Sequence, residues 1–280
     1  MKIEKILESY KPLIAIPIII TVIAVAILAI NGLDRGIELE GGILADLQLQ
    51  KPLNSSQLED TIKNGLGIDE VKVISSSSTQ ATVEMGGDVK YERLTNILNE
   101  KALVESFRSV DPVLSEEALT QVYWALAIAF IFMAVTIFII FRSLVPSIAV
   151  ILAAAMDIVI ALGGMSAFGI PLSLGSVGAL LLLIGYSVDT DVLLTTRVLK
   201  RRKGSITERA LDAMKTGITM AITSISAMVA LYVVVVLLIP AAAVLSNIAA
   251  VLIIGLAADI AVTWLMNMGI IRWYMESGRG

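Results

Sequence analysis

Six apolar runs, each of about the length that crosses a bilayer, constrain this chain more than any other feature. A membrane-spanning helix needs about 20 predominantly apolar residues, and five of the runs follow one another from residue 122 onward. The composition agrees, because 57% of the 280 residues are hydrophobic, against about 45–50% in soluble domains. We expect transmembrane helices over residues 12–31, 122–141, 146–168, 172–196, 217–238 and 243–267.

The first apolar run could also be a cleaved secretion signal. It follows a short basic segment, residues 1–11, and its uncharged part extends from Pro12 to Ile30. That stretch is longer than the 7–15 residues typical of a signal core. We therefore interpret it as a retained first transmembrane helix.

Residues 32–121 have a different character, with eight Lys and Arg against sixteen Asp and Glu. Alternating patterns predict strands over 43–50, 71–75, 81–85 and 102–110, and helices over 58–66 and 91–101, with Asn54 and Asp88 as caps. The order β-α-β-β-α-β is that of a ferredoxin-like module. The expected fold is a polytopic α-helical membrane protein with one small α+β domain between its first two spans.

The basic residues predict the orientation in the membrane. Thirteen of the 21 Lys and Arg lie in segment 1–11, at Arg142, in a loop over 197–216 and in a tail over 269–280. Basic residues are enriched in cytoplasmic segments. Both termini are therefore expected in the cytoplasm, with the domain 32–121 outside and the cluster 201–203 as a membrane anchor.

Charged side chains inside the apolar runs are the first candidates for function, because they are costly in a membrane and are kept mainly where a bundle interior uses them. Asp189 and Asp191 lie in one run, two residues apart. On a helix they point about 200° away from each other, so we expect only one of them to face the bundle interior. Alternatively, either one pairs with Arg197 or Lys200 and merely ends the span.

Two more carboxylates and one polar stripe support this candidate. Asp157 and Asp259 lie within the third and sixth runs, where each could be a structural, hydrogen-bonded acid. A stripe with helical spacing begins the fifth run and consists of Lys215, Thr219, Thr223 and Ser226. Its hydroxyls could join helices or line a hydrated path beside Asp189.

Two residue types are missing, and their absence restricts the chemistry. With no cysteine and no histidine in the chain, disulfides and thiolate chemistry are excluded, and proton transfer must use carboxylates, lysine or water. The spacing of the carboxylates predicts no metal site, and no nucleotide-binding loop is present. We expect no cofactor and no enzymatic activity.

Three short stretches, in the right order, resemble the SecF family of protein-export subunits, in its archaeal form. They are Arg35-Gly-Ile-Glu-Leu-Glu-Gly-Gly42, Ser109-Val-Asp-Pro-Val-Leu-Ser115 and the run from Gly185 to Arg197. The motif positions of the first and third stretches are Gly36, Glu38, Glu40, Gly41, Gly42, Gly185 and Arg197.

This resemblance implies a set of partners and a role for particular residues. The implied partners are a SecD-like subunit, a SecYE-type channel and the translocating polypeptide, in the cell membrane and with no nucleic acid required. The family's link to resistance–nodulation–division (RND) transporters implies coupling to a proton or sodium gradient. The register of the sister protein SecD assigns the coupling carboxylate to Asp189, with Asp191 as a second candidate and Lys215 as the opposite charge.

Two other functions remain open on the sequence. One is a stand-alone exporter of small molecules or lipids of the same superfamily. The other is an intramembrane aspartyl protease that would use Asp189 with Asp157 or Asp259. Dependence on a SecD-like partner would distinguish the export subunit from the first, and cleavage of a transmembrane peptide would indicate the second.

Overall fold

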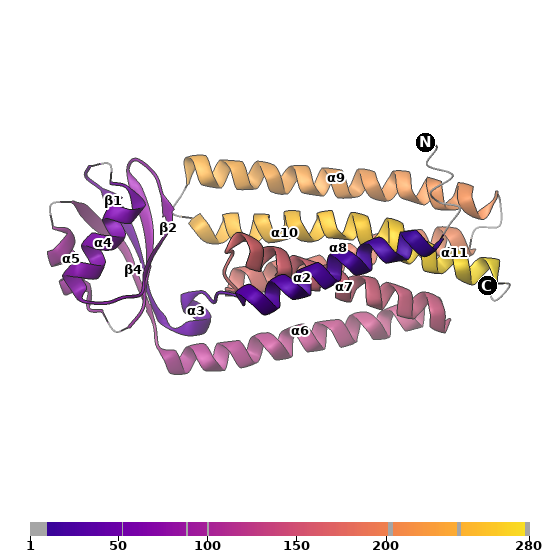
Figure 1. Cartoon of the computed structure of the whole chain (residues 1–280), viewed down its shortest axis with the longest axis horizontal. Helices are drawn as coiled ribbons and strands as arrows, with labels where there is room; N and C mark the ends of the chain where they lie inside the picture. Colours follow the sequence, from indigo (N-terminus) through magenta and orange to yellow (C-terminus); the bar gives the residue numbers. More distant parts are fainter. Residues whose placement is uncertain are drawn as a thin grey trace.

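The protein consists of a bundle of long helices with a small α+β domain at one end (Figure 1). The computed structural model describes residues 10–51, 53–87, 89–99, 101–200, 204–239 and 242–277. The bundle contains α2 (Tyr10–Asn31), α6 (Pro112–Phe141), α7 (Leu144–Phe168), α8 (Leu174–Lys200), α9 (Ile206–Leu238) and α10 (Ala243–Ala261), the last continued by the π-helix η2 (Val262–Asn267) and by α11 (Met268–Glu276).

Three of the six spans form the centre of the bundle, and three lie around it. Within the most apolar window of each span, about half the residues are buried in α7 and α8 (50% each) and in α10–α11 (56%), but only 17%, 11% and 11% in α2, α6 and α9. The outer helices expose large apolar side chains such as Ile19, Phe132 and Leu237. These side chains would face lipid, so the chain is a multi-pass membrane protein.

The domain has the predicted ferredoxin-like topology. Its strands are β1 (Gly42–Leu49), β2 (Val71–Ser76), β3 (Gln80–Met85) and β4 (Ala102–Val110), and its main helices are α4 (Ser55–Leu66) and α5 (Tyr91–Leu98). The sheet order is β2-β3-β1-β4, and all neighbouring strands are antiparallel. Helices α4 and α5 cover the face of the sheet that points away from the bundle (Figure 1).

Successive side chains of each strand point to opposite faces of the sheet, so the two faces pack against different parts of the protein. On β1, Ile43, Ala45 and Leu47 are at most 1% exposed and pack against apolar residues of α4 and α5, such as Leu58 and Leu94. The residues between them lie on the opposite face of the sheet, toward the bundle. The core of the domain is therefore separate from the core of the membrane helices.

Helix α9 begins well before the expected span. It starts at Ile206 rather than at residue 217, so most of the predicted loop 197–216 is helical. Ser205 caps this helix by accepting a hydrogen bond from the Glu208 amide (3.2 Å), and the Glu208 carboxylate accepts one from the Ser205 amide (2.9 Å). Ala210 and Ala213 are buried with residues of α8, which gives the extension an apolar face. Polarity alone suggested a loop, but this part is an amphipathic helix outside the apolar run.

Two other boundaries also differ from expectation. Helix α6 begins at Pro112, so residue 121, the expected end of the domain, lies inside a helix. The last helix continues through η2 and α11 to Glu276, where a tail from residue 269 was expected. A short helix that was not anticipated, α3 (Ile37–Glu40), precedes β1. Segment 1–9, Asp88 and the basic cluster 201–203 lie outside the described residues.

Candidate functional site

Each of the three central helices contributes one buried carboxyl group. Asp157 of α7 and Asp191 of α8 are 0% exposed, and Asp259 of α10 is 1% exposed. They are neighbours, because polar side chains of the same helices connect them. Together they form a polar cluster, Asp157–Asp191–Asp259, inside the membrane-spanning bundle.

Asp191 is held by two side chains of the π-helix η2. Its Oδ1 atom accepts hydrogen bonds from Thr263 Oγ1 at 2.9 Å and from Asn267 Nδ2 at 2.6 Å. Both partners are 0% exposed. Asp191, and not Asp189, is therefore the carboxylate of the third motif that faces the bundle interior.

Hydroxyl groups connect the three carboxyl groups. Thr263 Oγ1 also lies 2.9 Å from Asp259 Oδ1, so its single proton can serve either Asp259 or Asp191. Ser187 donates to Asp157 Oδ2 at 2.6 Å. Asp157 is thus linked to α8 through Ser187, and Asp191 is linked to Asp259 through Thr263.

The cluster has no cationic partner among the described residues. None of the ion pairs formed by the described residues involves these three carboxyl groups. In addition, five buried oxygen atoms of the cluster and its neighbours have no hydrogen-bond partner. These atoms are Asp157 Oδ1, Asp191 Oδ2, Asp259 Oδ2, Thr195 Oγ1 and Asn267 Oδ1. Buried polar atoms are normally paired, so this set is unusual. Within the described chain, no group of three acidic residues is arranged to hold a metal ion.

The π-helix is the part of the site that sequence reasoning missed. Hydrogen bonds that run one residue further than in an α-helix are rare, and they occur frequently at functional sites. Asp259, Thr263 and Asn267 recur every four residues in an otherwise apolar run, and that spacing could have revealed the stripe. The widened turn itself has no comparable sequence signal.

Asp189 lies on the opposite face of α8, where it is exposed. The same face carries Gly178, Leu182, Gly185 and Tyr186, all of which are exposed. A Cβ atom built on either glycine would meet nothing within 4 Å. We call these five residues the open face of α8. Asp189 is therefore a carboxylate within a membrane span that the described part of the chain leaves exposed.

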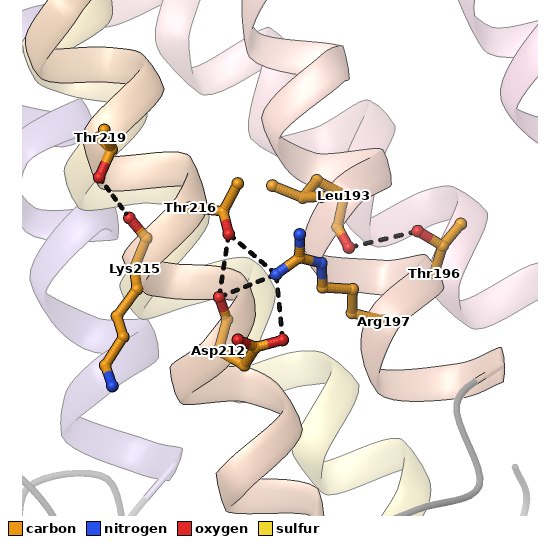
Figure 2. Close-up of polar contacts among 7 residues, drawn as sticks. All are labelled: Leu193, Thr196, Arg197, Asp212, Lys215, Thr216 and Thr219. Atoms are coloured by element: carbon orange, nitrogen blue, oxygen red, sulfur yellow. Dashed lines mark hydrogen bonds and ion pairs between the residues drawn. The ribbon is translucent and has the colours of Figure 1, made fainter.

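Arg197 does not neutralise either carboxylate of the motif. Its guanidinium donates through Nη1 to the main-chain oxygen of Asp212 (2.9 Å), to Asp212 Oδ2 (3.1 Å) and to Thr216 Oγ1 (2.9 Å), as Figure 2 shows. This motif residue therefore ties the end of α8 to α9. The alternative in which Arg197 pairs with Asp189 or Asp191 does not agree with this geometry.

The polar stripe on α9 lies on its outer surface. Lys215, Thr219, Thr223 and Ser226 are all exposed, and in Figure 2 the Lys215 side chain points away from Arg197. The hydroxyls of Thr219 and Thr223 donate to main-chain oxygens one turn earlier, at 2.8 Å and 3.0 Å. Among the described residues no ion pair joins Lys215 to Asp189. The structure thus does not bring Lys215 to the buried cluster.

The first family motif lies at the junction between the domain and the bundle. Gly41 and Gly42 have φ angles of 86° and 137°, which L-amino acids with a side chain rarely adopt. Glu38 contacts the start of α8 through a hydrogen bond to the Leu174 amide, whereas Glu40 is exposed. The motif is therefore a structural connection and is distant from the buried carboxyl groups.

Comparison with known proteins assigns the chain to a family. The family model described as the C-terminal part of the protein export membrane proteins SecD and SecF matches residues 90–277. The curated protein-export membrane protein SecF of Methanothermobacter thermautotrophicus is 59% identical over 98% of this chain and 96% of its own. The chain belongs to the SecF family. In this SecF-family chain, the open face and one member of the buried cluster, Asp191, lie on the fourth span, α8.

Solved structures show the same fold at low sequence identity. The crystal structure of SecDF from Thermus thermophilus matches with a TM-score of 0.78 and 18% identity, over 96% of this SecF-family chain and 38% of that chain. This chain thus spans less than half of SecDF. A heavy metal efflux pump matches with a TM-score of 0.53 and 12% identity, over 88% of this chain and 36% of the pump. The likeness to the pump concerns the fold alone.

Proposed function

We propose that this chain is a membrane subunit that promotes polypeptide export together with a SecD-like partner and a SecYE-type channel, driven by an ion gradient and without enzymatic activity. Its similarity to a named SecF protein over nearly the whole chain supports the export role. The fold of a fused SecDF protein, of which this chain spans 38%, supports a partner that supplies the remainder. Neither the small-molecule exporter nor the protease is favoured by this similarity.

The buried cluster is the observation that most directly supports ion coupling. Three carboxyl groups without a cationic partner lie within the membrane spans, and an uncompensated charge there costs at least about 2.5–3.5 kcal/mol. Protons or a small cation, taken up and released, can remove that cost. A ligand that binds one arrangement of the helices better than another shifts the population between them. Asp191 is the member to test, because it lies on α8 while its hydrogen-bond partners Thr263 and Asn267 lie on η2, so its contacts join two helices.

The open face of α8 is the proposed contact surface for the SecD-like partner. Small residues let helices approach closely in membranes, and Gly178 and Gly185 leave this face open. Asp189 lies on the same face and requires a polar or cationic group from outside this chain. Asp191 and Asp189 therefore receive separate roles, the first in ion coupling and the second in assembly.

The proposed orientation places the domain outside the cell and both termini in the cytoplasm. The start of α2, the α6–α7 turn and the end of α11 lie at the end of the bundle away from the domain (Figure 1). In the sequence, segment 1–11, Arg142, segment 197–216 and segment 269–280 together carry thirteen of the 21 Lys and Arg, whereas residues 32–121 have a net charge of −8. This asymmetry follows the positive-inside rule.

Two isosteric substitutions test these assignments. Asp191→Asn and Asp189→Asn are each made the sole copy in cells, and export of a secreted reporter, membrane abundance and co-purification of the SecD-like partner are measured. We expect Asp191→Asn to abolish export while the partner still co-purifies. Asp189→Asn should reduce the amount of partner recovered. The exposed Glu117 supplies the control Glu117→Gln, which should change neither readout.

Normal export by Asp191→Asn at normal abundance would contradict ion coupling through the cluster. Undiminished recovery of the partner with Asp189→Asn would contradict the assembly role of the open face. The two assignments can therefore fail independently.

A further inference from the structure

The segment between α2 and β1 joins the α+β domain to a helix that is remote from it in sequence. Residues 34–39 run past the start of α8, about 135 residues further along the chain. The domain is connected covalently to α2 and α6, but its connection to α8 depends on non-covalent contacts. Those contacts are made by Asp34, Gly36, Glu38 and Leu39.

The first contact is a pair of main-chain hydrogen bonds. The Gly36 amide donates to the Leu172 carbonyl at 2.8 Å, and the Leu172 amide donates to the Asp34 carbonyl at 2.8 Å. A Cβ atom on Gly36 would lie 3.3 Å from the Cβ of Ser173. The two segments therefore pair as a short parallel β-bridge between Arg35 and Leu172.

The second contact is a side-chain cap. The first amides of a helix have no partner within the helix, and at α8 the Leu174 amide donates to Glu38 Oε2 at 2.9 Å. Ser173 and Ser176 also cap this end, since the amide of each donates to the hydroxyl of the other. The negative charge of Glu38 also interacts favourably with the dipole at a helix N-terminus.

The third contact is apolar. Leu39 is 2% exposed and packs in one cluster with Leu172 and with Val122 of α6. The short helix α3 thus fits between the beginnings of two membrane spans, as its position in Figure 1 shows. Leu39 faces the bundle, and Glu38 faces the start of α8.

Little free chain separates these contacts from the domain. Gly41 and Gly42 follow α3 directly, and Gly42 is the first residue of β1, which pairs with β3 on one side and β4 on the other. A Cβ atom on Gly42 would lie 2.7 Å from the Met85 carbonyl oxygen. The segment therefore passes tightly against the sheet on one side and against α8 on the other.

We propose that residues 34–39, with Glu38 as the positioning residue, couple the α+β domain rigidly to α8, so that the two move as one body. Helix α8 carries Asp191 about 26 Å from this junction, at 1.5 Å per residue. A displacement of the domain would then also displace α8 and, with it, Asp191. The rigid connection between the domain and α8 is a property of the folded chain. Only its use in export rests on the proposed function.

Hydrogen–deuterium exchange of the purified protein tests the cap without any export assay. Glu38→Ala should make the amides at residues 174–176 exchange about fivefold faster, the change expected from the loss of one helix cap. The domain core around β1 should keep its protection. Glu40→Ala is the matched control, because Glu40 belongs to the same short helix and is exposed, and it should leave these amides unchanged.

A reversible cross-link tests rigidity. The chain has no cysteine, so Gly36→Cys with Ser173→Cys introduces a single thiol pair with Cβ atoms close enough for a disulfide. We expect the oxidised variant to form the bond and to export a reporter as well as its reduced form does. Failure to cross-link, or export lost on oxidation and restored by reduction, would overturn the proposal. If Glu38→Ala leaves the amide exchange unchanged, the cap assignment is wrong even where export is impaired.

Discussion

At the scale of single residues, Asp189 and Asp191 of α8 show how two positions about half a turn apart on one helix lie in different environments. Asp191 is completely buried and bonded to η2, whereas Asp189, two positions earlier, is exposed on the opposite face. The 100° turn per residue alone predicts this separation. Which of the two faces inward depends on where α7 and α10 pack, and that information is not local to the motif.

Two buried threonines near Asp191 provide a matched comparison. Thr263 donates to the cluster and Thr195 has no partner for its hydroxyl, although both are 0% exposed. Thr263→Val should lower the free energy of unfolding by about 1–3 kcal/mol, because it leaves carboxyl oxygens without a donor. Thr195→Val should be neutral or stabilising. Thermal unfolding in detergent measures both, and equal losses would contradict the assigned hydrogen bonds.

Glu84 in the domain provides a prediction on pH. Burial raises the pKa of Glu84 above its ordinary value, against the lowering effects of the Ile37 amide and Lys72. The folded state therefore holds this proton to higher pH than the unfolded chain does. The contribution of Glu84 to stability is complete below its ordinary pKa and is lost as the pH rises through the folded value.

Glu84→Gln should thus stabilise the protein at pH 7–8 and have little effect near pH 4. The gain should remain below about 1 kcal/mol, because the group keeps part of its hydration. Melting temperatures of the variant and the parent across this pH range measure the difference. A gain that is larger at pH 4 than at pH 8 would have the wrong sign.

At the scale of elements, the sequence predicted most of the fold and less of the site. Apolar runs located all six spans, and alternation in stretches such as 43–50 and 102–110 located the strands. Amphipathic helix outside the membrane was missed, as at residues 206–216, because polar residues on one face lower the average hydropathy there. The carboxyl groups were recognised as charges in apolar runs, but their contacts with Thr263 and Asn267 depend on the packing of α8 against η2.

The π-helix provides a prediction at this scale. A π turn holds more residues than an α turn, so Asn267 returns to the same side as Asp259. Deletion of Leu265 should remove the extra residue and restore α-helical hydrogen bonding. Asn267 would then follow Asp259 by seven positions, about 20° from the same side of the helix, so export should persist at normal abundance. Loss of export would contradict this account of the π turn. Deletion of Trp273, in α11 beyond the site, is the control and should likewise leave export in place.

At the scale of the whole molecule, the bundle resembles half of a larger assembly. Its three central helices are only about half buried within the chain, and the open face of α8 lies among them. The crystal structure of SecDF has the same fold in a chain of which this one spans 38%. The membrane part of this SecF-family chain therefore has a surface that the described residues leave exposed.

Abundance in the absence of the partner provides the corresponding prediction. Without a SecD-like subunit, Asp189 would face lipid at a cost of at least about 2.5–3.5 kcal/mol. Wild-type levels should fall in cells that lack the partner, and Asp189→Leu should restore them. Quantitative immunoblots of membranes measure this effect. Equal levels of both proteins without the partner would contradict it.

An exposed intramembrane carboxylate also has a consequence for the cell. If assembly covers Asp189 as proposed, a newly inserted chain without a partner would expose a carboxylate in the membrane, and membrane proteases could recognise that chain as unassembled. Asp189 on the open face of α8 would thus keep the two subunits in matched amounts without any regulation of their synthesis. The same side chain that makes the unassembled subunit short-lived would make the assembled pair the form that persists.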